Sequence, residues 1–444
     1  MLRTLGAAVL AACLIGFTAS GARAQSNPVF VPLPPAAGAL YKPDSGPAPH
    51  VALVVMHRTA NYMTHPACTE LSKRGFTVLC MNSRFVNNEA QVRWEQIALD
   101  VRAGVEFLRR QPGIAKVVLF GHSGGGPTMS FYQAVAENGV AFCQGPGKFS
   151  QCGPELAGLP PADGIVFADA HPGQPVMVMR ALIPDMPDET NPPTGQVDSS
   201  LDPLDPANGY NKDGLSHYSP AFQQRYFEAQ ARRMNAIAAD AVARTQAIAA
   251  GQYGYADDDV VILPRAGNPG AGPAGSFYLQ QADPSIARLN STVRPEKFLH
   301  NDGTITTEIV HSVIVPDPDI RRTALSFDLG TKVLNLKSFL SANAIRATDS
   351  VDQMDFCSSN NSTVCAVRAI SVPVTFAAMG GFVLIRDGEL EFENTASKDK
   401  DFVVIEGATH GFTGCQPCEK TPGQYANSFR NFFDYVRDWL NARY

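Results

Sequence analysis

The chain has 444 residues, of which 45% are hydrophobic and 18% are charged, and its formal net charge at pH 7 is −6. This balance is typical of a globular protein, because a disordered chain holds fewer apolar residues and more net charge. The sequence has no long basic run, so we exclude nucleic acid as a partner, since phosphate binding requires a concentrated basic surface.

The first 24 residues are typical of an export signal. Arg3 provides a positive charge, residues 5–17 form an apolar stretch shorter than a membrane span, and Ala22-Arg23-Ala24 offers a small-x-small cleavage site. A lipoprotein signal at Cys13 is the alternative, although the apolar stretch continues past that cysteine. No later stretch approaches the roughly 20 apolar residues of a membrane helix. We therefore expect a secreted or periplasmic protein, cleaved after Ala24, with no membrane span.

The cysteines agree with export, because disulfides persist in oxidising compartments. Proximity in the sequence favours three bridges and leaves one further pair: Cys143–Cys152, Cys357–Cys365 and Cys415–Cys418, then Cys68 with Cys80. The Cys-Gln-Pro-Cys run also resembles a redox dithiol, but no thioredoxin-like βαβ pattern surrounds it. We interpret it as a structural bridge.

Strands and helices alternate along the first part of the chain, after an extended lead-in at residues 25–49. Apolar runs of strand length lie at residues 51–56, 76–81, 117–120 and 165–168, and helical patterns lie at residues 66–74 and 89–110. Continuous apolar runs are typical of strands buried on both faces. Strands that alternate with helices predict an α/β protein with a doubly wound, mostly parallel sheet.

This rhythm stops after His171 and resumes near residue 372. The intervening segment holds Pro-rich loops and one long Ala-rich helix at about residues 220–250. Strand patterns return at residues 372–377 and 402–405, and an amphipathic helix follows at residues 425–440. We therefore expect a core formed by residues 25–171 and 371–444, with residues 172–370 inserted as a large cap.

The segment with the clearest chemistry lies between the strand at residues 117–120 and the next helix. It reads Gly121-His122-Ser123-Gly124-Gly125, which is G-x-S-x-G at a strand-to-helix turn. Glycines permit the tight turn, and the turn lifts the serine hydroxyl clear of the sheet. The helix that follows presents N–H groups at its positive end, where they can stabilise an oxyanion. Ser123 is therefore a candidate nucleophile.

A serine nucleophile requires a base, and the last predicted strand is followed by one. Glu406-Gly407-Ala408-Thr409-His410-Gly411-Phe412 places His410 in a Gly-rich loop before the final helix. The chain resembles the α/β-hydrolase superfamily over residues 51–171 and 372–444, because the G-x-S-x-G turn, the insertion and the His410 loop follow one another in that order. The resemblance implies that Ser123 is the nucleophile and His410 the general base.

The resemblance also implies an oxyanion hole and a triad acid. The backbone N–H of Gly124 is the first oxyanion donor, and Thr59 in the loop His57-Arg58-Thr59 is the expected second donor, although Arg58 replaces the usual Gly. The acid has three candidates. No carboxylate stands just past residues 372–377, where relatives often carry one, so we favour Asp169, directly after the strand at 165–168, with Asp387 and Glu389 as alternatives.

Metal and cofactor chemistry has weaker sequence support. His57 and His65 lack a metal-ligand spacing such as HExxH, and the sequence has no dinucleotide fingerprint. His171 is equally a pocket residue or an ordinary loop histidine.

We expect no cofactor and a serine hydrolase that cleaves a small carboxylic ester with an apolar portion. Amidase, lactonase or thioesterase activity would use the same triad, and a non-catalytic binding protein with this fold is the alternative from another class.

Overall fold

The computed structural model describes residues 27–186, 198–266, 278–286, 290–315, 331–349, 351 and 353–444. The expected signal segment, residues 1–24, lies outside the described residues.

The core is a ten-stranded sheet with the order β1-β2-β4-β3-β5-β6-β13-β14-β8-β9. Its strands are β1 (Val29–Leu33), β2 (Ala36–Tyr41), β3 (Val51–His57), β4 (Thr77–Asn82), β5 (Lys116–His122), β6 (Gly164–Ala168), β8 (Glu296–Leu299), β9 (Ile305–Glu308), β13 (Val374–Met379) and β14 (Lys400–Ile405). All neighbours from β4 to β8 are parallel, while β1, β2 and β9 pair antiparallel. Every residue of β3 is buried, which explains its continuous apolar run.

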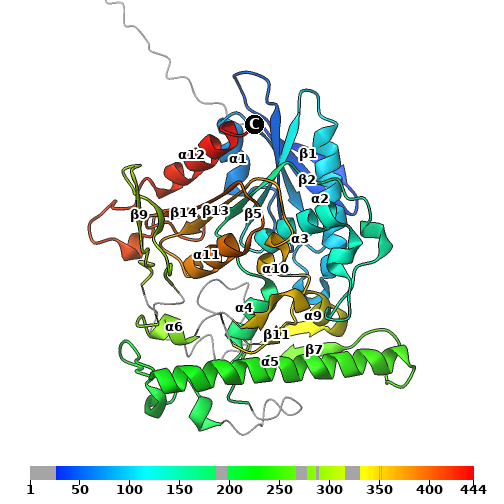
Figure 1. The fold of residues 1–444 in the computed structure, drawn as a ribbon, viewed down its shortest axis with the longest axis vertical. Helices are drawn as coiled ribbons and strands as arrows, with labels where there is room; N and C mark the ends of the chain where they lie inside the picture. The colour runs from blue at the N-terminus through cyan, green and yellow to red at the C-terminus, as the bar shows by residue number, and fades with distance from the viewer. Residues whose placement is uncertain are drawn as a thin grey trace, which may run out of the picture.

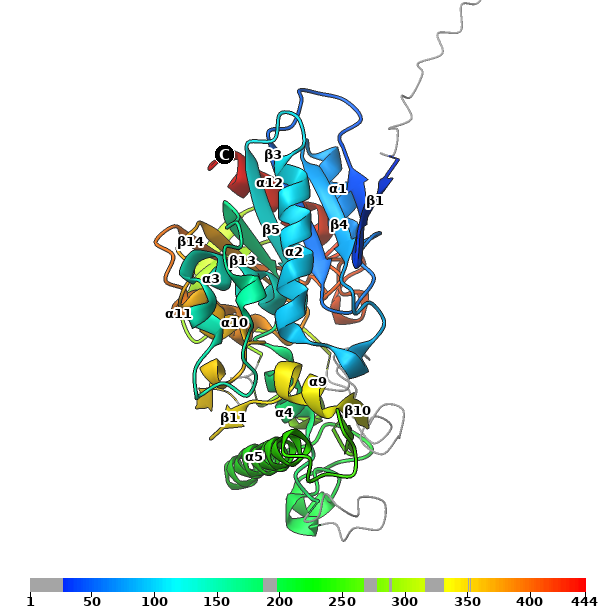
Figure 2. The same ribbon diagram turned by 90° about the vertical axis from the view of Figure 1, so that its right-hand side faces the viewer.

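Helices cover both faces of this sheet, as Figures 1 and 2 show. One apolar cluster joins the sheet to α2 (Trp94–Arg109), α3 (Gly125–Asn138) and α11 (Ile385–Asn394). A second cluster, on the other face, joins it to α1 (Pro66–Lys73) and α12 (Ser428–Asn441). The predicted doubly wound α/β architecture is therefore confirmed.

A separate layer of structure lies at the end of the molecule opposite the C terminus (Figure 1). Its longest element is α5 (Pro220–Ala249), which agrees with the expected helix and is capped by the Ser219 side chain. A third apolar cluster packs α5 against α4 (Gln174–Ala181) and α9 (Leu336–Ala342), beside the ribbon of β7 (Val260–Leu263) and β10 (Lys332–Asn335). These elements all fall within the expected insertion.

Three details differ from the sequence-based expectations. Residues 29–41 form the β1–β2 hairpin rather than a plain extended lead-in. The helix expected from residue 89 begins at Trp94, after a short 3₁₀ turn at Glu89–Gln91. The insertion is also not a single block, because β8 and β9 return to the core and extend the sheet beyond β14. Strands as short as β8 and β9 hold too few apolar residues for an alternating pattern to be recognised in the sequence.

Four disulfides link the chain at Cys68–Cys80, Cys143–Cys152, Cys357–Cys365 and Cys415–Cys418. The pairing expected from proximity is confirmed. In the part of the chain that the structure describes, helices are either too short or too polar to cross a membrane.

Candidate active site

Ser123 lies on a strained turn between β5 and α3. Its φ is +56°, a left-handed conformation that costs a non-glycine residue free energy and is typical of functional turns. The turn requires the neighbouring glycines. A β-carbon on Gly121 would lie 2.7 Å from the Gly125 carbonyl oxygen, and one on Gly125 would lie 2.6 Å from the Met56 carbonyl oxygen. The glycines of the motif therefore allow the close packing that holds Ser123 at the carboxyl edge of the sheet.

The Ser123 turn presents a side-chain hydroxyl and a backbone N–H group. Among the described residues, neither the Ser123 hydroxyl nor the Gly124 backbone N–H has a hydrogen-bond partner. Gly124 directly precedes the first turn of α3, where helix N–H groups carry partial positive charge. An oxygen that becomes negative beside Ser123 would meet this N–H.

Asp169 and His410 are joined although 241 positions separate them in the sequence. The Asp169 Oδ2 lies 2.5 Å from the His410 Nδ1, and the Asp169 Oδ1 accepts the Met379 N–H at 3.0 Å. Burial raises the pKa of the Asp169 carboxyl, and the hydrogen bond from His410 opposes that rise. Because Nδ1–H donates to the carboxylate, the proton-accepting nitrogen of His410 is Nε2.

The two alternative acids have other partners. Asp387 receives two hydrogen bonds from the Arg180 guanidinium, at 2.8 and 2.9 Å. Glu389 accepts the backbone N–H groups of Val293 and Arg294 and pairs with Arg386. Both carboxylates are thus engaged in holding elements of the fold together, and Asp169 is the one in contact with His410.

A chain of histidines fixes the loop that carries His410. The Ala67 N–H donates to the His65 Nδ1, so His65 carries its proton on Nε2, which lies 2.9 Å from the His122 Nδ1. His122 in turn contacts the carbonyl oxygen of His410 through Nε2 at 2.8 Å. In the sequence His122 occupies the variable position of the G-x-S-x-G motif, and its place directly before Ser123 is the one local signal of this role.

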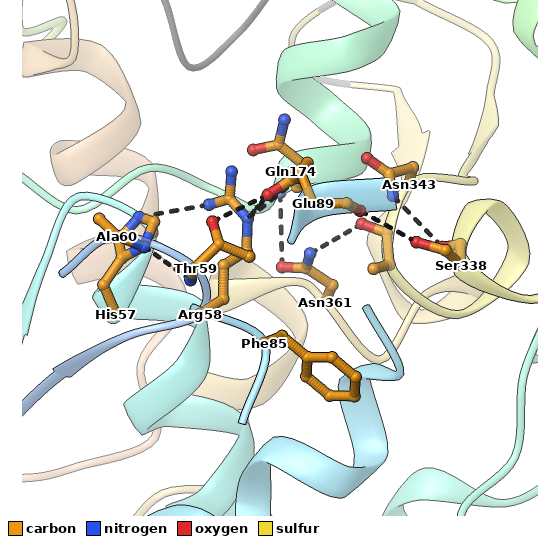
Figure 3. A network of polar contacts seen from close by, with 12 residues as sticks. His57, Arg58, Thr59, Ala60, Phe85, Glu89, Gln174, Ser338, Asn343 and Asn361 are labelled. Atoms are coloured by element: carbon orange, nitrogen blue, oxygen red, sulfur yellow. Dashed lines mark hydrogen bonds and ion pairs between the residues drawn. The ribbon is translucent and has the colours of Figure 1, made fainter. Parts of the chain in front are cut away.

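Thr59 does not have the expected orientation. Its N–H donates to the His57 Nδ1 at 3.0 Å, and the Ala60 N–H donates to the same atom at 2.8 Å, as Figure 3 shows. The expectation of a free Thr59 amide beside the serine is therefore corrected, because the ring nitrogen at the end of β3 accepts it. The replacement of the usual Gly by Arg58 gave the only warning of this loop geometry.

The side chain of Arg58 is buried and turns toward Gly124. Its Nε donates to Glu89, and its Nη1 lies 3.5 Å from the His57 Nε2 and 3.4 Å from the His171 Nε2. His171, left open by the sequence, thus lies beside the nucleophile turn. Within the described residues, no group of three or more His, Cys, Asp or Glu side chains is arranged to hold a metal ion.

The topology and the site together define the class of fold. A serine on a strand-to-helix turn, followed along the chain by an aspartate after β6 and a histidine after β14, is the arrangement of the α/β-hydrolases. The protein has the α/β-hydrolase fold, as its sequence resemblance implied.

The solved structures that the chain matches are distant in sequence. A monoacylglycerol lipase from Paleococcus ferrophilus is 12% identical over 94% of this chain and 100% of its own, with a TM-score of 0.39. The siderophore hydrolase EstB from Aspergillus fumigatus is 10% identical over 94% and 98%, with a TM-score of 0.40. No family model and no curated protein matches the chain. The fold assignment therefore rests on the strand order and the nucleophile turn of this chain itself.

Proposed function

We propose that the protein is a secreted serine hydrolase that cleaves a carboxylic ester through an acyl-enzyme. The observation that carries this proposal is the contact between Asp169 and His410 at the edge of the sheet where the strained turn presents Ser123. An acid that orients a histidine at the sheet edge that also carries a half-buried serine supports nucleophilic catalysis by that serine.

Each residue of the site has a defined part in the proposed reaction. His410 Nε2 removes the Ser123 proton as the hydroxyl oxygen attacks the ester carbonyl, and Asp169 holds the imidazole and stabilises its charged form. The Gly124 N–H donates to the oxyanion. His410 then gives the proton to the leaving alcohol, and a water molecule activated by the same histidine releases the acid and restores Ser123.

The loop ordering around His410 supports this assignment. His122 holds the His410 carbonyl, and the Phe382 ring stacks on the His410 ring with 4.5 Å between centroids. The first contact holds the backbone of His410 and the second holds its ring before substrate arrives, and catalysis gains from such preorganisation. The inserted elements around α5 are the proposed cap, whose apolar residues suit an apolar portion of the substrate.

A fluorophosphonate probe tests the proposal, because it reacts with activated serines. The purified protein should be labelled, and Ser123→Ala and His410→Ala should both lose the label. Graded 4-nitrophenyl esters, with matched amides, lactones and thioesters, would then rank the substrate classes. A folded wild-type protein that takes no label would contradict the proposal and favour a binding protein with this fold.

A further inference from the structure

Three buried side chains beside Gly124 direct hydrogen-bond donors at one point. The His57 Nδ1 accepts two backbone N–H groups, and the His171 Nδ1 accepts the Gly173 N–H at 3.1 Å. A neutral imidazole whose Nδ1 accepts must carry its proton on Nε2. Both Nε2 atoms are therefore N–H donors, as is the Arg58 guanidinium.

These donors face one another rather than acceptors. The Arg58 Nη1 lies 3.5 Å from the His57 Nε2 and 3.4 Å from the His171 Nε2, yet no N–H of this group can accept from another. A β-carbon built on Gly124 would lie 2.1 Å from the Arg58 Nη1, 2.5 Å from the His57 Nε2 and 3.1 Å from the His171 Nε2. The three donors thus converge beside the residue that follows the nucleophile.

Their burial makes the missing acceptor costly. Arg58 is 5% exposed, His171 5% and His57 8%. Burial, followed by the Arg58 charge, lowers the pKa of both histidines well below the usual value, so they are neutral and keep one N–H each. Buried donors without acceptors lose free energy, and an oxygen with negative charge would satisfy all three.

The charged groups around Arg58 also favour a bound anion. Glu89 is the carboxylate in contact with Arg58, and it is shared with Lys332, whose Nζ lies 3.5 Å from its Oε1. Burial raises the pKa of Glu89, but these two cations outweigh that effect and hold the pKa below its usual value. Figure 3 shows Arg58 between His57 and Glu89, with contacts from its guanidinium to both side chains. Two buried cations therefore share one half-buried carboxylate.

We propose that Arg58, His57 and His171 form a subsite for a carboxylate group of the substrate, beside the scissile ester. This deepens the proposed function and rests on it, because it defines the substrate as an ester that carries a permanent negative charge near its carbonyl. The two cations stay buried and share the one carboxylate of Glu89 whether or not a reaction is under way. A substrate group with a permanent negative charge therefore balances them better than an oxyanion that forms only briefly. Arg58 presents Nη1 to the carboxylate while its Nε stays on Glu89.

Matched substrates test the subsite. The 4-nitrophenyl monoesters of glutaric and adipic acid carry a free carboxylate, and 4-nitrophenyl pentanoate and hexanoate have the same chains without it. We expect the wild-type protein to prefer the charged esters in kcat/KM by about tenfold or more. Arg58→Gln should reduce this ratio by about tenfold, to near one, because the buried charged hydrogen bond is lost. Arg102→Gln, which removes a surface arginine paired with Glu106, should leave the ratio unchanged.

The outcomes separate this proposal from the proposed function. Equal losses for charged and neutral esters in Arg58→Gln would overturn the subsite and assign Arg58 to the oxyanion or to structure. If Arg58→Gln does not fold, His171→Phe removes one donor and keeps a ring, and an unchanged ratio in that variant overturns the subsite.

A binding experiment decides the subsite even where no ester is cleaved. Glutarate titrated into Ser123→Ala should bind, and binding should weaken at least tenfold with Arg58→Gln added. Absence of glutarate binding overturns the subsite, whereas absence of fluorophosphonate labelling overturns only the hydrolase proposal.

Discussion

Two residues at the proposed site have backbone conformations that cost free energy. Ser123 has φ +56° and Asp169 has φ +42°, and such positions typically cost about 1–3 kcal/mol each. Both follow directly on buried parallel strands, β5 and β6, so they lie at the carboxyl edge of the sheet. The surrounding packing must stabilise these conformations, so single substitutions here have separable effects on activity and on stability.

Asp169→Asn should lower kcat for ester hydrolysis by about 10²–10⁴-fold with little change in KM, because an amide cannot stabilise the charged His410 ring. Steady-state kinetics on the folded protein would measure this. Asp387→Asn is the matched control. It should destabilise the protein by about 3–5 kcal/mol through the loss of the buried Arg180 pair, with kcat of the folded fraction within about threefold. The reverse pattern would identify Asp387 as the acid.

Gly121→Ala should destabilise the protein and displace the nucleophile turn. The new methyl group would lie 2.7 Å from the Gly125 carbonyl oxygen and 2.8 Å from the Gly126 Cα, and backbone atoms cannot move aside as a flexible side chain does. We expect a loss of about 1–3 kcal/mol in the free energy of unfolding and a loss of fluorophosphonate labelling. Urea denaturation and labelling of the folded protein would check both effects, and full labelling at native stability would contradict the packing argument.

At the scale of elements, α1 and the end of β5 are connected through a histidine. His65 is the N-cap residue of α1, where its Nδ1 accepts the Ala67 N–H, and its Nε2 contacts His122 at the end of β5. Burial, followed by the His410 charge, lowers the pKa of His65 to about 3. The neutral ring therefore stabilises the fold above the unfolded pKa near 6.5, and this contribution is lost as the pH falls toward 3.

His65→Asn should make stability less dependent on pH. Asn is a favourable N-cap residue, so the α1 cap is kept while the titrating ring is removed. Between pH 6 and 4 the slope of unfolding free energy against pH should decrease by about 1.4 kcal/mol per pH unit, the effect of one proton. Urea denaturation of the wild-type protein and of His65→Asn at several pH values measures the two slopes. The other titrating groups are the same in both proteins, so they do not contribute to the difference between the slopes. Parallel curves would show that His65 does not titrate on unfolding.

At the scale of the whole molecule, the disulfides constrain segments of different length. Cys68–Cys80 joins α1 to β4, with both cysteines fully buried, whereas Cys415–Cys418 closes a three-residue separation in the loop after His410. A disulfide that closes a longer loop removes more conformational entropy from the unfolded chain, so Cys68–Cys80 should stabilise the fold more than Cys415–Cys418 does.

Replacing Cys68 and Cys80 together with Ala should cost about 3 kcal/mol of unfolding free energy, against about 1.5 kcal/mol for Cys415 and Cys418. Denaturant titration of the two double variants tests this order. A smaller loss for the Cys68 and Cys80 variant would contradict it, and kcat measured alongside would report whether the His410 loop depends on its own bridge.

The sequence by itself determined the local features of this protein. The apolar runs predicted β3 to β6 and the parallel sheet, since burial on both faces leaves a continuous apolar pattern. G-x-S-x-G predicted the turn at Ser123, and proximity predicted three of the disulfides and left Cys68 with Cys80 as the fourth. These features depend on residues close together in the chain, so their patterns are readable without a structure.

Only the tertiary structure decided which distant groups meet. Asp169 contacts His410 rather than leaving that position to Asp387 or Glu389, and the Thr59 amide is bound by the His57 ring. The convergence of Arg58 with His171, and the return of β8 to the sheet, have no local pattern at all. Such contacts follow from the packing of elements far apart in sequence, because the direction and surroundings of a side chain are fixed only when the sheet, its loops and the inserted segment come together.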